Sequence, residues 1–120
     1  MTRRSERVSN LIRQEISKLL QEQVNDPRLK SFISVTEVTT TADLRNARIY
    51  VSVLGSEAEK AEALRGFKAA AGYFRRELAS RLVLRYIPEL TFYRDDSIER
   101  GSHIMELIQQ AALEDVADDN

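Results

Sequence analysis

The stretch KAAAGYFRR, residues 68–76, decides how the middle of this 120-residue chain folds. Apolar residues at three- and four-residue spacing precede Gly72, and Phe74, Leu78 and Leu82 continue that spacing after it, which predicts helix on both sides. Gly72 costs about 1 kcal/mol relative to alanine inside a helix. We therefore predict a bend at Gly72, where two helices meet at a small-residue corner. A glycine that only lets two helices pack closely is the alternative.

Cations cluster around this corner. Residues 66–86 carry five Lys and Arg against the single carboxylate of Glu77. Cations beside the free N–H groups of a helix N-terminus form an anion site, whereas an ordinary solvated surface with local ion pairs is the alternative. The candidate contacts to a polyanion here are Lys68, Ala70, Ala71, Gly72, Arg75, Arg76, Arg81 and Arg85.

Outward from the corner, the pattern predicts a single α+β domain at residues 1–113. Residues 4–24 are spaced as an amphipathic helix, two β-branched stretches form an antiparallel hairpin, and Ser56 and Ser97 are expected helix N-caps. The order is helix, strand, strand, helix, bend, helix, strand, helix, and we expect helices on one face of a three-stranded sheet. The expected strands are 31–40, 45–54 and 88–95; the last helix uses Ile104, Leu107, Ile108 and Ala111.

Composition and charge limit the classes of function. The chain is 42% hydrophobic and 31% charged, has no cysteine, and has no apolar run long enough for a membrane span, so we expect a cytoplasmic monomer. The net charge of −1 hides an asymmetry. Residues 1–88 carry 16 Lys and Arg against 10 Asp and Glu, whereas residues 89–120 carry 2 against 9. The acidic residues 114–120 are expected to be a disordered tail.

Further cations lie outside the corner. Arg3, Arg4 and Arg7 cluster where the first helix begins, the end that favours anions, and they are further candidate contacts to a polyanion. Arg45 and Arg48 are undecided, because either could pair with Glu37 across the hairpin. The aromatic residues that could stack on a base, or simply pack, are Tyr50, Tyr73 and Tyr86.

The sequence offers little for catalysis. A lone helical histidine such as His103 is much more often a surface residue than a general base. Asp95, Asp96 and Glu99 could suggest a magnesium site, but a turn with a helix N-cap is the better explanation. No phosphate-binding glycine signature occurs. We therefore expect no enzyme activity, no metal and no cofactor.

The predicted element order resembles a type II KH fold, although the usual GXXG loop is replaced by Ala-Ala-Gly. Several ordered motifs make the chain similar to the ribosome-binding factor A family over roughly residues 3–110. Each motif alone is weak, and the ordered set is specific. The motifs are NDPRL at 25–29, AGYFR at 71–75, RYIPELTF at 85–92 and DS at 96–97.

The resemblance implies a bacterial assembly factor without enzymatic activity. Such a factor binds the free 30S subunit and its 16S rRNA, assists late processing of that RNA and is often linked to cold adaptation. Assembly GTPases are candidate further partners. The competing class is a protein-interaction adaptor whose basic face meets an acidic partner, and binding to RNA in the absence of other proteins separates the two.

Overall fold

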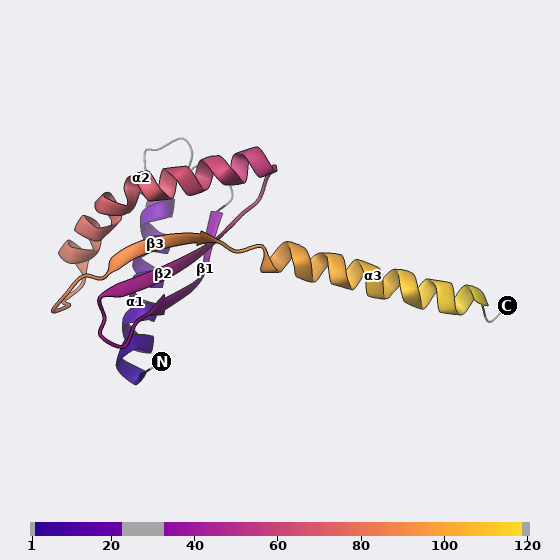
Figure 1. Cartoon of the computed structure of the whole chain (residues 1–120), viewed down its shortest axis with the longest axis horizontal. Helices are drawn as coiled ribbons and strands as arrows, with labels where there is room; N and C mark the ends of the chain where they lie inside the picture. Colours follow the sequence, from indigo (N-terminus) through magenta and orange to yellow (C-terminus); the bar gives the residue numbers. More distant parts are fainter. Residues whose placement is uncertain (1, 23–32, 119–120) are drawn as a thin grey trace.

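The computed structural model describes residues 2–22 and 33–118, with side chains described except at 98–100, 102 and 114–118. Two helices lie against one face of a sheet, and a third helix leaves the domain (Figure 1). The expected end of the first helix at 24, its Asn-Asp-Pro stop and the expected strand start at 31 fall outside the described residues. The elements are α1 Arg3–Glu22, β1 Ile33–Thr40, β2 Asn46–Val53, α2 Glu57–Arg81, β3 Glu89–Arg94 and α3 Ser97–Asp118.

The sheet has the order β1-β2-β3 and is mixed. β1 and β2 form the predicted antiparallel hairpin, with Val38 opposite Ile49. β3 pairs in parallel with β2, and Phe92 lies opposite Ile49 on that side. Parallel neighbours need a crossover connection, which α2 supplies as the helix of a βαβ unit. The α+β class is therefore confirmed.

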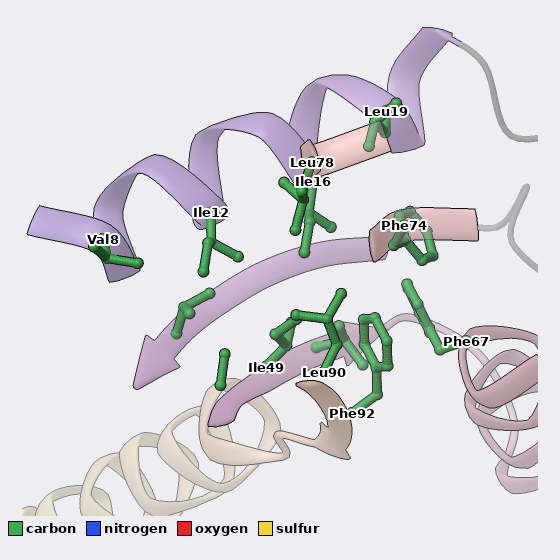
Figure 2. Close-up of a cluster of buried hydrophobic side chains, with 13 residues drawn as sticks. Val8, Ile12, Ile16, Leu19, Ile49, Phe67, Phe74, Leu78, Leu90 and Phe92 are labelled. Atoms are coloured by element: carbon green, nitrogen blue, oxygen red, sulfur yellow. The ribbon is translucent and has the colours of Figure 1, made fainter. Parts of the chain in front are cut away.

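The core lies between the sheet and the inner faces of α1 and α2. From α1, Val8, Ile12, Ile16 and Leu19 point toward the sheet (Figure 2). α2 contributes two buried phenylalanines, whose ring centroids lie 4.8 Å (Phe67) and 5.6 Å (Phe74) from that of Phe92 in β3. The helical and alternating spacings of the sequence are explained by this one shared core. Its other main members are Ile49, Val51, Leu78 and Leu90.

The predicted break at Gly72 is wrong. α2 is one helix over its 25 residues, and it curves along its length (Figure 1). Gly72 does not have a positive φ, and a Cβ added there would meet only Arg76 Nη1 at 3.7 Å, an ordinary contact. Burial of Phe67 and Phe74 on either side outweighs the small cost of one glycine. The corner therefore provides no second helix N-terminus with free N–H groups.

The prediction that the last helix covers the sheet is also wrong. α3 projects away from the domain (Figure 1), and its described side chains are exposed, Ile108 by 56%. Its backbone stays helical through Asp118, so residues 114–118 continue α3 instead of forming a separate tail; Glu114 and Ala117 are good helix formers. Residues 119–120 are not among those described.

The N-cap predicted at Ser56 is confirmed, because Ser56 caps α2 in a reciprocal capping box with Glu59. Ser97, the other predicted cap, is the first residue of α3, and its N–H donates to Asp95 Oδ1 at 2.9 Å in a turn that precedes the helix. In the part of the chain that is described, no helix combines the length and apolar character required to cross a bilayer.

Candidate nucleic-acid interface

Three segments meet at one end of the domain and line a groove of about 240 Å³. They are the beginning of α1, the turn between β1 and β2, and the loop between α2 and β3. Arg4, Arg7 and Arg85 give the groove its charge. The rest of the lining is Tyr86 together with apolar side chains, namely Val8, Leu11, Leu44, Val83 and Leu84.

The arginines of this groove are not neutralised inside the molecule. Arg3, Arg4 and Arg7 lie on the first turns of α1, where Thr2 caps the helix by accepting the N–H of Ser5 at 3.1 Å. None of the three forms an ion pair with a described carboxylate. A helix N-terminus carries a partial positive charge, so these guanidinium groups oppose it and favour an added anion. Glu6 is the acidic residue of the same first turn.

Tyr86, in the α2–β3 loop, lies close to two guanidinium groups. The Cζ atoms of Arg85 and Arg45 are 5.5 Å and 6.0 Å from its ring centroid. Tyr86 is 53% exposed, and its hydroxyl makes no hydrogen bond with a described residue. Such exposed cation–π contacts are worth about 0.5–1 kcal/mol. An exposed aromatic ring flanked by cations is a common binding surface for single-stranded nucleic acid.

The β1–β2 turn places Arg45 beside this ring. The N–H of Arg45 donates to Asp43 Oδ1 at 3.1 Å, and the hydroxyl of Thr41 donates to the same oxygen at 2.6 Å. These two hydrogen bonds, the hydroxyl first, hold the pKa of Asp43 below its ordinary value. Leu44 has a φ of 62°, which is rare for a leucine, and its side chain lines the groove.

Tyr86 also lines a second, more open groove of about 390 Å³, and Arg75 forms part of its wall. Arg75 Nε donates to the carbonyl of Pro88 and Nη2 to that of Ile87, both at 3.1 Å. The guanidinium group therefore holds the backbone just after Tyr86 in place. Glu89 is the carboxylate in this groove.

The remaining corner candidates lie elsewhere. Lys68, Gly72 and Arg76 follow each other at four-residue spacing on the exposed outer face of α2. Arg81 lies between α1 and α2 and pairs with Glu15 at 3.6 Å and Glu77 at 3.4 Å. Ala70 and Ala71 are partly buried and pack against the core.

Two of the three acidic candidates, Asp95 and Asp96, take part in hydrogen bonds at the opposite end of β3, and the side chain of the third, Glu99, lies outside the described residues. Arg94 donates to both carboxylate oxygens of Glu57, at 2.6 and 2.7 Å, and to Asp96 at 2.8 Å. The hydrogen bonds from Arg94 lower the pKa of Glu57. Asp95 accepts from Thr36 at 2.6 Å. Within residues 2–22 and 33–118, no group of three or more potential ligands could hold a metal ion.

Reasoning from sequence missed part of this site. It left Arg45 open and did not join Tyr86 to the arginines of α1. Neither Arg45 nor Arg48 pairs with Glu37 among the residues described, because Glu37 lies opposite Tyr50 in the sheet. The signal available in the sequence was the run Arg85-Tyr86, an aromatic residue beside a cation.

The element order and the mixed sheet define a small α+β domain, and arginines gather at one end of it. The sequence model of the family "Ribosome-binding factor A" matches residues 4–108. The ribosome-binding factor A of Acetivibrio thermocellus is 52% identical over 111 residues, which cover 92% of this chain and 90% of that protein. The chain therefore belongs to the ribosome-binding factor A family.

Solved structures agree with this assignment. The solution NMR structure of a putative ribosome binding factor A from Thermotoga maritima is 39% identical, with a TM-score of 0.59, and covers 72% of this chain and 85% of its own. A homology model of the Thermus thermophilus ribosome binding factor A, fitted into the cryo-EM map of a 30S complex of that factor, is 25% identical with a TM-score of 0.61. It covers 73% of this chain and 91% of its own.

Proposed function

We propose that this protein is a ribosome assembly factor that binds the free 30S subunit through its 16S rRNA and assists late maturation of that RNA without catalysing a reaction. The observation that carries the proposal is the groove with Arg4, Arg7 and Arg85, whose charges no described carboxylate neutralises. Membership of the family and the similar factor placed in a 30S complex support it.

The proposed mechanism is capture of one rRNA conformation. Arginine side chains bind phosphates through charge-assisted hydrogen bonds, and these contacts position the protein without reading base sequence. Selectivity then comes from the shape of the folded RNA that fits the basic end of the domain. Binding holds that shape while other factors act on the RNA, so the protein itself needs no reacting group.

The test compares two variants that each lose three positive charges. One variant replaces Arg4, Arg7 and Arg85 by Gln, and the control replaces Arg65, Lys68 and Arg76 on the outer face of α2 by Gln. Co-sedimentation with purified 30S subunits is measured over a salt series. We expect the groove variant to lose affinity by orders of magnitude, with the salt slope lowered by about 0.7–0.9 for each lost phosphate contact. If the control variant loses as much affinity as the groove variant, or more, the proposed groove is wrong and the outer face of α2 is the interface.

The remaining parts of the proposal are carried over from the sequence. They are a cytoplasmic location and a monomeric state and, from the family resemblance, a link to cold adaptation and assembly GTPases as further partners. Binding of the wild-type protein to 16S rRNA stripped of ribosomal proteins separates RNA recognition from an adaptor role. An adaptor for acidic proteins would bind intact 30S particles and leave the naked RNA unbound.

A further inference from the structure

We propose that Tyr86, flanked by Arg45 and Arg85, is a stacking site for one unpaired RNA base, and that Arg4 and Arg7 bind the phosphates beside that base. This inference rests on the proposed function, because it names the part of the RNA that the basic end recognises. It places base contact at the α2–β3 loop, at the end of the domain, and not at the corner of α2.

Tyr86 is a preformed platform. The two residues that follow it anchor the loop to the domain, because Pro88 is buried and Ile87 is partly buried against the core. Arg75 holds the carbonyl groups of both residues at 3.1 Å. Tyr86 itself stays more than half exposed and lines both grooves. A rigid backbone below an exposed ring lowers the entropy lost when a base binds.

The cation–π contacts of Tyr86 are weak enough to be exchanged. At 5.5 and 6.0 Å they lie near the outer limit for such contacts, and at an exposed site each is worth about 0.5–1 kcal/mol. Stacking of a base on an aromatic side chain is worth about 1–3 kcal/mol. A base can therefore replace one guanidinium on the ring face, and the displaced arginine remains close enough to bind the adjoining phosphate. Arginine planes also stack on bases directly.

The charge around the ring favours RNA over a protein partner. None of Arg4, Arg7, Arg45 and Arg85 pairs with a described carboxylate, and Glu89 is the acidic residue that lines the second groove. The buried centres of protein interfaces are depleted in charge, and each buried cation would need its own carboxylate. A nucleic-acid strand supplies a negative charge at every nucleotide. The base must be unpaired, because duplex bases have both faces covered by their neighbours.

The experiment uses the full chain and a single-stranded oligoadenylate of about eight nucleotides that contains one 2-aminopurine, whose fluorescence falls on stacking. Tyr86→Ala is expected to weaken binding about 5- to 150-fold with an unchanged salt slope and to abolish the fluorescence change. Tyr86→Phe should keep both. Arg4→Gln and Arg7→Gln should each lower the slope by about 0.7. The control is Tyr93→Ala, which removes another exposed ring, one stacked on Tyr50.

Wild-type affinity in Tyr86→Ala, or an equal loss in Tyr93→Ala, would overturn the stacking site. The same variants are assayed on purified 30S subunits. If Tyr86→Ala weakens 30S binding and leaves oligoadenylate binding unchanged, the ring contacts a ribosomal protein and the inference is wrong. The proposed function itself would be wrong if the wild-type protein did not sediment with 30S subunits at any salt concentration, and this result differs from every outcome that concerns Tyr86.

Discussion

Replacing Gly72 by alanine is expected to stabilise the protein. Gly72 lies in the middle of α2, on its exposed face, and does not have a positive φ. The new methyl group would meet only Arg76 Nη1 at 3.7 Å. Alanine gains up to about 1 kcal/mol over glycine in such a helix, since it loses less backbone entropy on folding. We therefore expect the free energy of unfolding to rise by about 0.5–1 kcal/mol. For a domain of this size that raises Tm by about 2–8 °C.

The measurement is urea unfolding followed by circular dichroism, with the slope m as a check that the unfolded state is unchanged. Ala69→Gly is the matched control, because Ala69 is also exposed on α2 and lies three residues away. It should lower the free energy of unfolding by about the amount that Gly72→Ala raises it. If Gly72→Ala instead destabilises the protein, α2 needs glycine for a bend, and the description of Gly72 as an ordinary helical residue is refuted.

Three further predictions concern other parts of the chain. Arg75→Met should lower the free energy of unfolding by about 1–3 kcal/mol, because it removes two hydrogen bonds to backbone carbonyls. The control Arg76→Met should change it by less than about 0.5 kcal/mol. Equal effects of the two variants in urea unfolding would argue against the Arg75 contact. The pKa of Asp43, followed by NMR titration, should lie below its ordinary value and should rise in Thr41→Val. Because the pKa is lowered in the folded state, the turn loses this stabilisation only as pH falls through that pKa. A normal pKa in the wild type would contradict the turn geometry. Truncation after Leu113 should leave Tm nearly unchanged and 30S affinity equal or slightly higher at low salt, and a clear loss of either would mean that these residues dock.

The spacing of apolar residues predicted most of the helices and strands, because these elements all bury one side in the same core. The spacing of Ile12, Ile16 and Leu19, and the alternation of Ile49 and Val51, both record which side faces that core. Gly72 misled because its cost of about 1 kcal/mol is small beside the burial of Phe67 and Phe74. The apolar residues of α3 predicted packing by the same rule, but spacing alone does not say whether a partner face exists.

The candidate site was less predictable than the fold. Composition identified the arginines, but which of them are neutralised depends on residues far away in sequence. Arg81 meets Glu15 of α1, and Arg75 bonds the carbonyls of a loop more than ten residues later. Arg45 reaches Tyr86 through a turn in which Leu44 has a positive φ, and a leucine gives no signal of that conformation.

The isolation of α3 limits what calorimetry can detect. None of its described side chains is buried, so α3 shares little of the cooperative transition of the domain. A helix of 22 residues standing alone is close to marginal in water, and its helicity falls gradually on heating. The endotherm therefore belongs to the residues that precede Ser97. Its enthalpy near 60 °C should be closer to about 67 kcal/mol than to the roughly 84 kcal/mol expected if all 120 residues unfolded together.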